Sequence, residues 1–220
     1  MVRFEDVSNG SFERVSFRIG PGMLCKIIAR SEPDKNALLE TMLSLGRLDG
    51  GRVLLMGRDI YALGTKELLP VFGRMGVVLK EGRVISNLRV WENITLPACY
   101  HNGAGPSELE AKVEGFYLAM GFQKGRIGSY LGKSPELLPA RERRLMGVIR
   151  AMLAEPDLII YDSPFEDMDA ETAGRLDEVI TRFHRAGKGR ATVFAGSHEE
   201  ALGPARADMV LKQQGKGFAS

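Results

Sequence analysis

The segment from residue 29 to residue 36 contains a lysine at a position where it could bind phosphate. The phosphate-binding pattern G-x-x-x-x-G-K-[ST] has its lysine seventh. Here the eight residues are Ala29, Arg30, Ser31, Glu32, Pro33, Asp34, Lys35 and Asn36. Only Lys35 matches this pattern. Because lysines at helix starts are usually solvated, the match alone does not indicate a function.

The residues before Lys35 are poorly suited to wrapping around a phosphate. The chain has 26 glycines, yet none lies between residues 29 and 36, so the backbone freedom of a phosphate loop is absent. Pro33 lacks an N–H donor, and Glu32 and Asp34 place carboxylates where phosphate oxygens would arrive. Asn36 stands where a serine or threonine would hold magnesium. We predict weak or absent triphosphate binding through this acidic, proline-stiffened bend.

Hydrophobic patterning predicts an α/β core around this segment. The alternating runs at 2–7 and 13–19 predict an antiparallel pair of strands. Further strands are expected at 23–29, 52–56, 75–79, 158–161 and 191–195. The last two runs are apolar without alternation, which is typical of strands covered on both faces in a parallel sheet. The apolar residues at 38–43 and 176–183 have helical spacing and predict helices that pack against this sheet.

The pattern becomes helical from about residue 84 to residue 154. Ser107 and Glu110, after Pro106, have the spacing of a capping box at the start of one helix. A second amphipathic helix is expected to end before Pro156. We therefore expect a single domain over 1–220, with a core lobe at 1–83 and 155–212, a helical subdomain at about 84–154, and a tail at 213–220.

Composition excludes several classes of protein. Lys and Arg total 30 and Asp and Glu total 28, and this net charge of +2 gives no bulk attraction to nucleic acid. The apolar runs are too short for the roughly 18 residues of a membrane span. Cys25 and Cys99 lie in apolar contexts, and we expect both to be buried thiols. The charged start at Arg3, Glu5 and Asp6 predicts no signal peptide and a cytosolic location.

Four further segments occur in an order that resembles a known family. They are GRVLLMGRDI at 51–60, MGVVLKEGRVISNLRVWENITLP at 75–97, ELLPARERRLMGVIRAMLAEPDLIIYDSPFEDMD at 136–169 and VFAGSHE at 193–199. With the segment around Lys35, they are similar to the ATP-binding subunits of ABC transporters, in register from about Val15 to Val210. The sequences around Trp91 and in the segment DSPFEDMD are most similar to those of the ATPases of MCE-type lipid transporters.

This resemblance implies a fold, cofactors and partners. The implied fold is a P-loop NTPase-like ABC ATPase core, with a mixed, largely parallel sheet, helices on both faces, N-terminal antiparallel strands and a helical insert. The implied cofactors are ATP and magnesium, whose binding we predict to be weak or absent. The implied partners are a transmembrane permease and a second ABC ATPase, in a homodimer or heterodimer, at the inner face of the membrane.

The resemblance also assigns roles to individual residues, with several departures from the family pattern. Lys35, Asn36, Lys80, Asp162 and Asp169 fall at nucleotide-binding positions, with Asn36 and Asp162 toward magnesium. Lys80 stands where the family has the Q-loop glutamine.

The position of the family's catalytic glutamate is filled by Ser163, which is no base near neutral pH. His198 falls at the switch-histidine position; it either retains that role or is an ordinary histidine near a helix start. We therefore expect no intact catalytic residue.

Three other positions have alternative interpretations. The family's LSGGQ signature is replaced by residues 138–142. Arg141, Arg143 and Arg144 either contact phosphate or form a solvated basic helix face. Phe12, or alternatively Phe4, is the candidate for stacking on adenine, although a core aromatic ring is the competing interpretation. Trp91 either contributes to a permease-binding groove or is buried in the insert.

Two functions follow from these features. The first is a degenerate ABC-type subunit that is deficient in ATP binding and hydrolysis and acts as a structural or regulatory partner of a permease or of a competent ATPase. A narrower version of this hypothesis places the subunit in lipid transport. The second is an active ATPase in which residues such as Lys80 rebuild an unusual site and energise a transporter.

Overall fold

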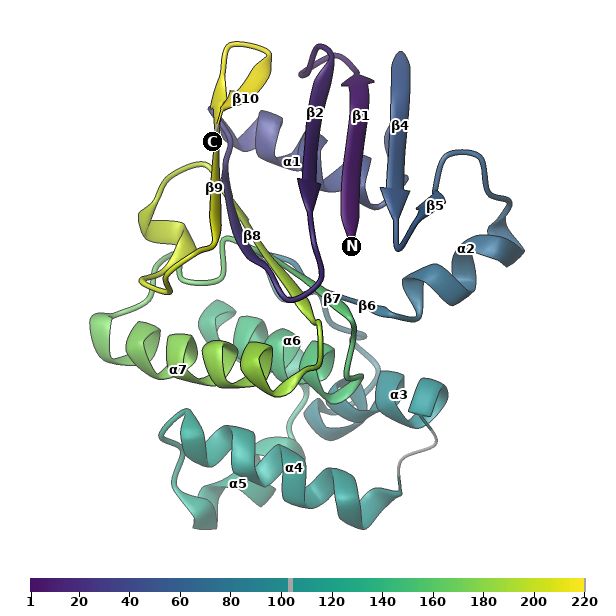
Figure 1. Ribbon diagram of the computed structural model, residues 1–220. Coiled ribbons are helices and arrows are strands. Elements are labelled where there is room, and N and C mark those ends of the chain that lie inside the picture. Colours follow the sequence, from purple (N-terminus) through teal and green to yellow (C-terminus); the bar gives the residue numbers. More distant parts are fainter. Residues whose placement is uncertain (103–104, 220) are drawn as a thin grey trace.

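The computed structural model describes residues 1–102 and 105–219 and contains two β-sheets (Figure 1). One sheet has the strand order β2-β1-β4-β5 and is antiparallel; the other has the order β10-β9-β3-β8-β7-β6. The strands are β1 Val2–Ser8, β2 Val15–Ile19, β3 Leu24–Ile28, β4 Gly50–Leu55, β5 Arg58–Asp59, β6 Met75–Val78, β7 Leu158–Asp162, β8 Ala191–Gly196, β9 Met209–Gln214 and β10 Gly217–Ala219.

The larger sheet is parallel except for β10, which pairs antiparallel with β9. Its central strands β7 and β8 are buried at every position, as their unbroken apolar runs predict. The pairing aligns Asp162 at the end of β7 with Ala195 near the end of β8. The carboxyl ends of β3, β6, β7 and β8 therefore lie at one edge, where a parallel sheet positions ligand-binding loops.

Helices cover both faces of the parallel sheet. The helices are α1 Glu32–Met42, α2 Thr65–Phe72, α3 Val90–Asn102, α4 Pro106–Ala119, α5 Lys124–Leu131, α6 Ala140–Leu153 and α7 Ala170–Ala186, with 3₁₀ turns η1 Pro135–Leu137 and η2 Glu200–Leu202. On one face α1 packs between the two sheets, where Leu38 and Met42 join an apolar cluster with residues of β1, β4 and β8. On the other face α6 and α7 pack through Val148, Leu176 and Ile180.

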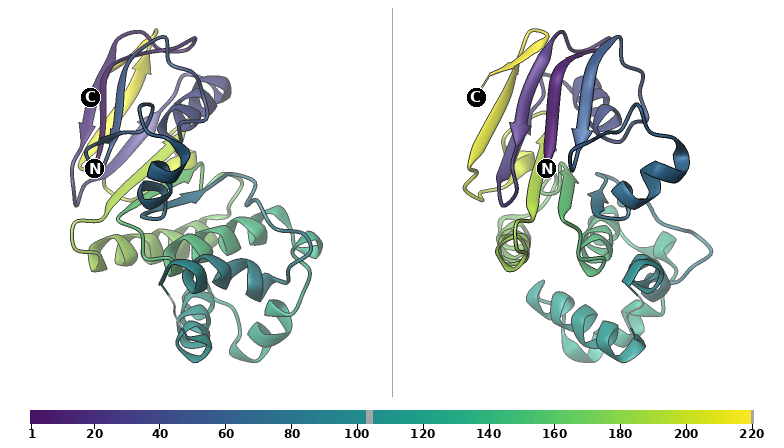
Figure 2. Two further views of the ribbon diagram at one scale, coloured as in Figure 1. Left: turned by 90° about the vertical axis from the view of Figure 1, so that its right-hand side faces the viewer. Right: turned by 45° about the vertical axis from the view of Figure 1, so that its right-hand side comes forward.

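The helical insert lies below this core in Figure 1 and has its own apolar cluster. Val90 and Ile94 of α3, Val113 and Tyr117 of α4 and Ile149 of α6 belong to this cluster. Figure 2 shows α4 and α5 on the side of α6 and α7 away from the sheets, and α3 packs alongside α6. Because α6 contributes to this cluster and also to the sheet-facing one, it joins the insert to the core.

Some predicted elements differ from the structure. The acidic bend expected before Lys35 is instead the start of a helix, because α1 begins at Glu32 with Pro33 in its first turn, a position where proline is tolerated. The helix α2 was missed, because it is short and contains Pro70. The predicted tail contains β10, and α4 begins at Pro106 after Gly105, so Ser107 is not its cap.

Two further features concern membrane-spanning helices and the cysteine thiols. None of the helices in the described part of the chain is long and apolar enough to cross a bilayer. Cys25 is buried in β3, as expected, but Cys99 is exposed on α3, so the prediction of two buried thiols is wrong for Cys99. Position 99 faces outward because the apolar side of α3 is formed by Val90, Ile94 and Ala98.

Candidate functional site

A cavity of about 460 Å³ lies where the carboxyl ends of β3, β6 and β7 meet α1. Its lining side chains with a charge or an amide group include Glu32, Lys35, Asn36, Lys80 and Asp162. The structure thus brings together four of the predicted site residues, namely Lys35, Asn36, Lys80 and Asp162. Loops after neighbouring parallel strands come together at one sheet edge, which explains why residues so distant in sequence share this cavity.

The Lys35 ammonium is buried between two carboxylates. Its side chain is only 1% exposed, and Nζ lies 2.6 Å from Asp162 Oδ1 and 2.8 Å from Glu32 Oε2. Lys35 and Glu32 are one helical turn apart on α1, while Asp162 comes from the end of β7. The positive charge that a phosphate would need is therefore already paired within the chain.

Glu32 also binds groups from two other loops. Its Oε1 accepts a hydrogen bond of 2.6 Å from Ser197 Oγ, and its Oε2 lies 3.6 Å from Lys80 Nζ. Partial burial alone would raise the pKa of Glu32, but hydrogen bonds from Lys35 and Ser197 and the charges of both lysines lower this pKa to about 2. This carboxylate is ionised at neutral pH and binds two lysines and a hydroxyl, as a phosphate oxygen would.

Lys80 is held by a further carboxylate. Its Nζ lies 2.6 Å from Glu166 Oε1, and this hydrogen bond outweighs partial burial and raises the pKa of Lys80. Arg144 fixes the same region, since its buried guanidinium donates to the carbonyl of Lys80 at 2.7 Å and to that of Glu166. The expectation of a solvated basic face is therefore wrong for Arg144, because this arginine joins the two loops.

Four backbone N–H groups of this segment, those of Ala29, Arg30, Asp34 and Lys35, also have internal acceptors. The N–H of Ala29 donates to Gly196 O at 2.8 Å, and the N–H of Arg30 donates to the Gln213 side chain at 3.0 Å. At the helix start, the N–H of Asp34 donates to Ser31 Oγ and that of Lys35 donates to Ser31 O. Ser31 thus caps α1, and its hydroxyl takes a donor that phosphate loops direct at their ligand.

The Asp162 carboxylate also has partners within the chain for both of its oxygens. Besides Lys35, its carboxylate accepts from Ser163 Oγ and from the N–H of Lys80, both at 3.2 Å. Asn36 is exposed on the cavity wall. Within residues 1–102 and 105–219, no group of three or more His, Cys, Asp or Glu side chains is arranged to hold a metal ion. As arranged here, these residues do not fit a magnesium-bound triphosphate, because a carboxylate lies against both lysines.

Ser163 does not face the cavity. It is fully buried, its N–H donates to Ala195 O at 2.9 Å, and its backbone adopts φ of 45°. A non-glycine residue in this left-handed region carries strain, which the surrounding hydrogen bonds offset. The hydroxyl donates to the Asp162 carboxylate at 3.2 Å, and a serine hydroxyl is not itself a base near neutral pH.

Asp169 and His198 lie outside this cavity. Asp169 caps α7 by accepting from the N–H of Thr172 at 2.8 Å, and it pairs at its exposed carboxylate with Arg141 at 3.1 Å. His198 is exposed next to Ser197 and lines a separate hollow with Phe165. Neither residue contacts Lys35. The residue that precedes His198 in the sequence, Ser197, does reach the cavity, where it donates to Glu32.

Phe12 is a core residue, so its assignment as a nucleotide-stacking ring is wrong. Its side chain is 1% exposed and packs against Phe218 of β10, with 5.5 Å between ring centroids. The alternative, Phe4, is also buried and stacks on Phe17 at 4.4 Å. A buried ring has no free face for a base, so neither position offers a stacking platform.

Comparison with solved structures establishes the fold. The dimeric structure of MJ0796, a bacterial ABC transporter cassette, is similar with a TM-score of 0.83 and 16% identity, over 100% of this chain and 97% of that one. The structure of cbiO1 from Clostridium perfringens, part of the ABC transporter complex cbiONQ, is similar with a TM-score of 0.78 and 14% identity, over 100% and 86% of the two chains.

Sequence comparison finds relatives of the same class, the ATP-binding proteins of ABC transporters. The methionine import ATP-binding protein MetN of Rhizobium johnstonii is 27% identical over 215 residues, which cover 96% of this chain and 57% of the relative. The chain is related to the ATP-binding subunits of ABC transporters and has their fold. The phosphonates import ATP-binding protein PhnC of Alcaligenes faecalis is 28% identical over 174 residues, covering 78% of this chain and 63% of PhnC.

This ABC ATPase-like chain spans less than two thirds of the length of MetN and PhnC. No model of a protein family matches it. The predicted resemblance and fold class are confirmed by the relatives and the similar structures.

Glu32, Ser197 and Glu166 are site residues that the sequence reasoning missed. Glu32 was expected only to repel an incoming phosphate, although its position three residues before Lys35 is the spacing of a helical ion pair and was a usable signal. Glu166 and Ser197 reach the site through loops after β7 and β8. No local pattern marks them, because their contacts depend on how those loops fold.

Proposed function

We propose that this chain is an ABC transporter ATP-binding-type subunit that has kept the fold and lost most of the nucleotide chemistry. It acts as a structural or regulatory partner of a membrane permease or of a competent ATPase. The observation that carries the proposal is the Glu32 carboxylate, which lies 2.8 Å from Lys35 and 2.6 Å from Ser197 in the cavity where the family binds phosphate.

Magnitudes support weak nucleotide binding. Micromolar affinity corresponds to about 8 kcal/mol. Each buried donor that a ligand leaves unsatisfied or must take from an internal acceptor costs about 1 to 3 kcal/mol. A triphosphate would have to displace Glu32 from two lysines. A few such costs remove most of the free energy of micromolar binding.

Hydrolysis is disfavoured independently of binding. Ser163 is buried and its hydroxyl is not a base at neutral pH, so it cannot replace a glutamate that takes a proton from water. Loss of a positioned general base slows such reactions by about 10²- to 10⁴-fold. Even a nucleotide-bound form would therefore turn over slowly.

Calorimetry with Mg-ATP tests the proposal. We expect no binding tighter than about 1 mM for the wild-type chain. A Glu32→Gln variant keeps the shape of the side chain and removes its charge, so we expect it to bind Mg-ATP measurably better than wild type. Glu178→Gln, at an exposed position that does not line this cavity, is the control for removal of a carboxylate elsewhere and should not change the affinity. A low-micromolar dissociation constant for the wild-type chain would refute the proposal.

The second candidate is an active ATPase with an unusual site. It is favoured by the common location of Lys35, Lys80 and Asp162 in one cavity and by the Glu32 side chain, which is 41% exposed and has room to leave the lysines. Steady-state phosphate release by the purified chain, abolished in Lys35→Ala, would support this candidate. Absence of release with and without a partner subunit supports the first.

The permease and the cargo form a further part of the proposal. Trp91 lies on a hollow of about 660 Å³ formed by α3, α4 and α5, which offers a surface to a membrane subunit at the inner face of the membrane. The sequence around Trp91 favours a lipid as the cargo, whereas the names of MetN and PhnC favour import of a small polar solute. Co-purification from the native source identifies the permease. A permease of another transporter class would exclude the lipid assignment, and recovery without any permease or second ATPase would contradict the partner role.

A further inference from the structure

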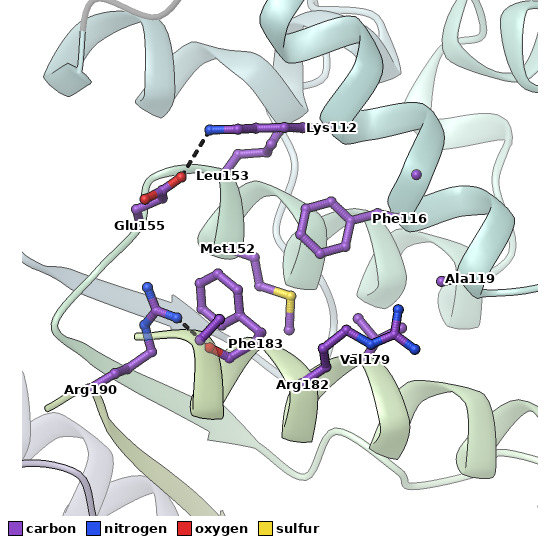
Figure 3. Close-up of a pocket in the computed structure, with 12 residues that line it drawn as sticks. Lys112, Phe116, Ala119, Met152, Leu153, Glu155, Val179, Arg182, Phe183 and Arg190 are labelled. Carbon is purple, nitrogen blue, oxygen red and sulfur yellow. Dashed lines mark hydrogen bonds and ion pairs between the residues drawn. The ribbon is translucent and has the colours of Figure 1, made fainter. Parts of the chain in front are cut away.

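A second cavity, of about 450 Å³, lies between α4 of the insert and α7 of the core (Figure 3). It shares no lining residue with the cavity at Lys35. Its walls are mainly apolar and include Phe116 of α4, Met152 of α6 and Val179 and Phe183 of α7. Ligand pockets are commonly concave, apolar and of this size, with a few polar groups that fix orientation.

The two aromatic rings are only partly covered by the protein. Phe116 and Phe183 pack against the cluster that contains Met152 and Val179, yet both remain partly exposed, and both point into the opening in Figure 3. The wall also includes Gly115, where an added Cβ would meet nothing within 4 Å. The cavity therefore extends to the backbone of α4 and has room for an apolar group.

The rim of this cavity carries more positive than negative charge. Its charged residues are Lys112, Arg182, Arg190 and Glu155. Glu155 accepts from Lys112 at 2.9 Å, and Lys112 also pairs with Glu108 at 2.9 Å. These pairs neutralise Lys112, so the excess positive charge of the rim is that of the two arginines, which lie at opposite ends of the cavity in Figure 3.

The two arginines differ in how they are held. The Arg190 guanidinium stacks 3.6 Å above the Phe183 ring and donates to the Pro156 carbonyl at 2.8 Å. Arg182 is exposed, and among residues 1–102 and 105–219 no hydrogen bond or ion pair to its side chain is formed. A guanidinium at the mouth of an apolar cavity is suited to bind a carboxylate.

We propose that this cavity binds a small amphipathic monoanion, whose apolar body lies against Phe116 and Phe183 and whose anionic group pairs with Arg182. A cavity of about 450 Å³ accommodates an acyl chain of about ten carbons. Because its walls come from α4 in the insert and α7 in the core, the bound molecule would contact both parts. It would thereby strengthen their packing, which gives the site a regulatory role independent of the cavity at Lys35.

Isothermal titration of the full chain with decanoate tests this inference, and decanol serves as the uncharged comparison. We expect saturable one-site binding of decanoate below about 1 mM. Gly115→Leu should abolish this binding by filling the cavity, and it should preserve the fold because the added side chain enters open space. Arg182→Gln should weaken decanoate binding by about threefold to fivefold, the range of a partly exposed ion pair, and leave decanol unchanged.

Arg185→Gln is the matched control, since Arg185 is exposed on the same helix and does not line the cavity. It should bind decanoate as the wild-type chain does. Absence of saturable decanoate binding would overturn the inference, as would binding that persists in Gly115→Leu. Equal affinity of wild type and Arg182→Gln for decanoate would overturn the assignment of the anionic group to Arg182.

Discussion

Replacement of Lys35 by methionine tests whether its ammonium is a structural part of the folded chain. Methionine keeps most of the apolar stem and removes the charge, leaving Asp162 and Glu32 without their common partner. Removal of one member of a buried ion pair costs about 3 to 5 kcal/mol. Asp162 retains hydrogen bonds from Ser163 and from the N–H of Lys80, so we expect a loss of about 3 kcal/mol.

The loss should be visible in urea and thermal unfolding followed by circular dichroism. For a chain of this size, about 1 kcal/mol corresponds to a change of about 2 to 4 °C in Tm, so Lys35→Met should lower Tm by about 6 to 12 °C. The double variant Lys35→Met with Asp162→Asn removes both charges. It should recover part of the loss, because the buried carboxylate no longer lacks a partner.

Lys80→Met is the control, because its ammonium is also paired at 2.6 Å but its side chain is 30% exposed. A partly exposed pair contributes about 1 kcal/mol or less. If Lys35→Met destabilises the chain no more than Lys80→Met does, Lys35 is not a buried structural cation. The same conclusion follows if the costs of Lys35→Met and Asp162→Asn are simply additive.

Three further predictions concern other parts of the chain. Folding lowers the pKa of Glu32 from 4.5 to about 2, so the ionised carboxylate stabilises the chain fully above about pH 4.5 and loses this contribution as the pH falls toward 2. The free energy of unfolding should therefore decrease less on acidification in Glu32→Gln than in the wild-type chain. The difference should be at most about 1 kcal/mol, because solvent screens this group. Burial raises the pKa of Cys25 to about 12, so iodoacetamide at pH 8 should label Cys99 alone in the native chain, and rapid labelling of a Cys99→Ser variant would contradict this. Asp169 caps α7, so Asp169→Ala should lower the midpoint of urea unfolding, whereas Arg141→Ala should leave it nearly unchanged; equal effects would show that the ion pair matters more than the cap.

Much of the core follows from local patterns. The apolar runs at 158–161 and 191–195 predict the buried strands β7 and β8, and the structure has them fully covered. The common location of Lys35, Lys80 and Asp162 follows from the order of motifs, because a parallel sheet brings the loops after its strands to one edge. Hydrophobic periodicity and motif order were therefore enough to predict that these three residues lie in one cavity.

The contacts within that meeting place were harder to predict. The segment before Lys35 was expected to be an open bend, but Ser31 caps a helix that starts at Glu32, and the helix turns the Glu32 carboxylate onto Lys35. Arg144 was expected to be solvated, yet its guanidinium finds two carbonyls. Each outcome depends on a partner supplied by a distant loop, and hydrophobic periodicity contains no information about such partners.

The position of Glu32 has a mechanical consequence for the edge of the sheet. Its carboxylate, carried on the helix after β3, contacts Lys80 from the loop after β6 and Ser197 from the loop after β8. Three segments that are far apart in sequence are thus cross-linked by one side chain. A force applied by another protein to the segment around Lys80 would reach the segment around His198 directly, without any small molecule lying between them.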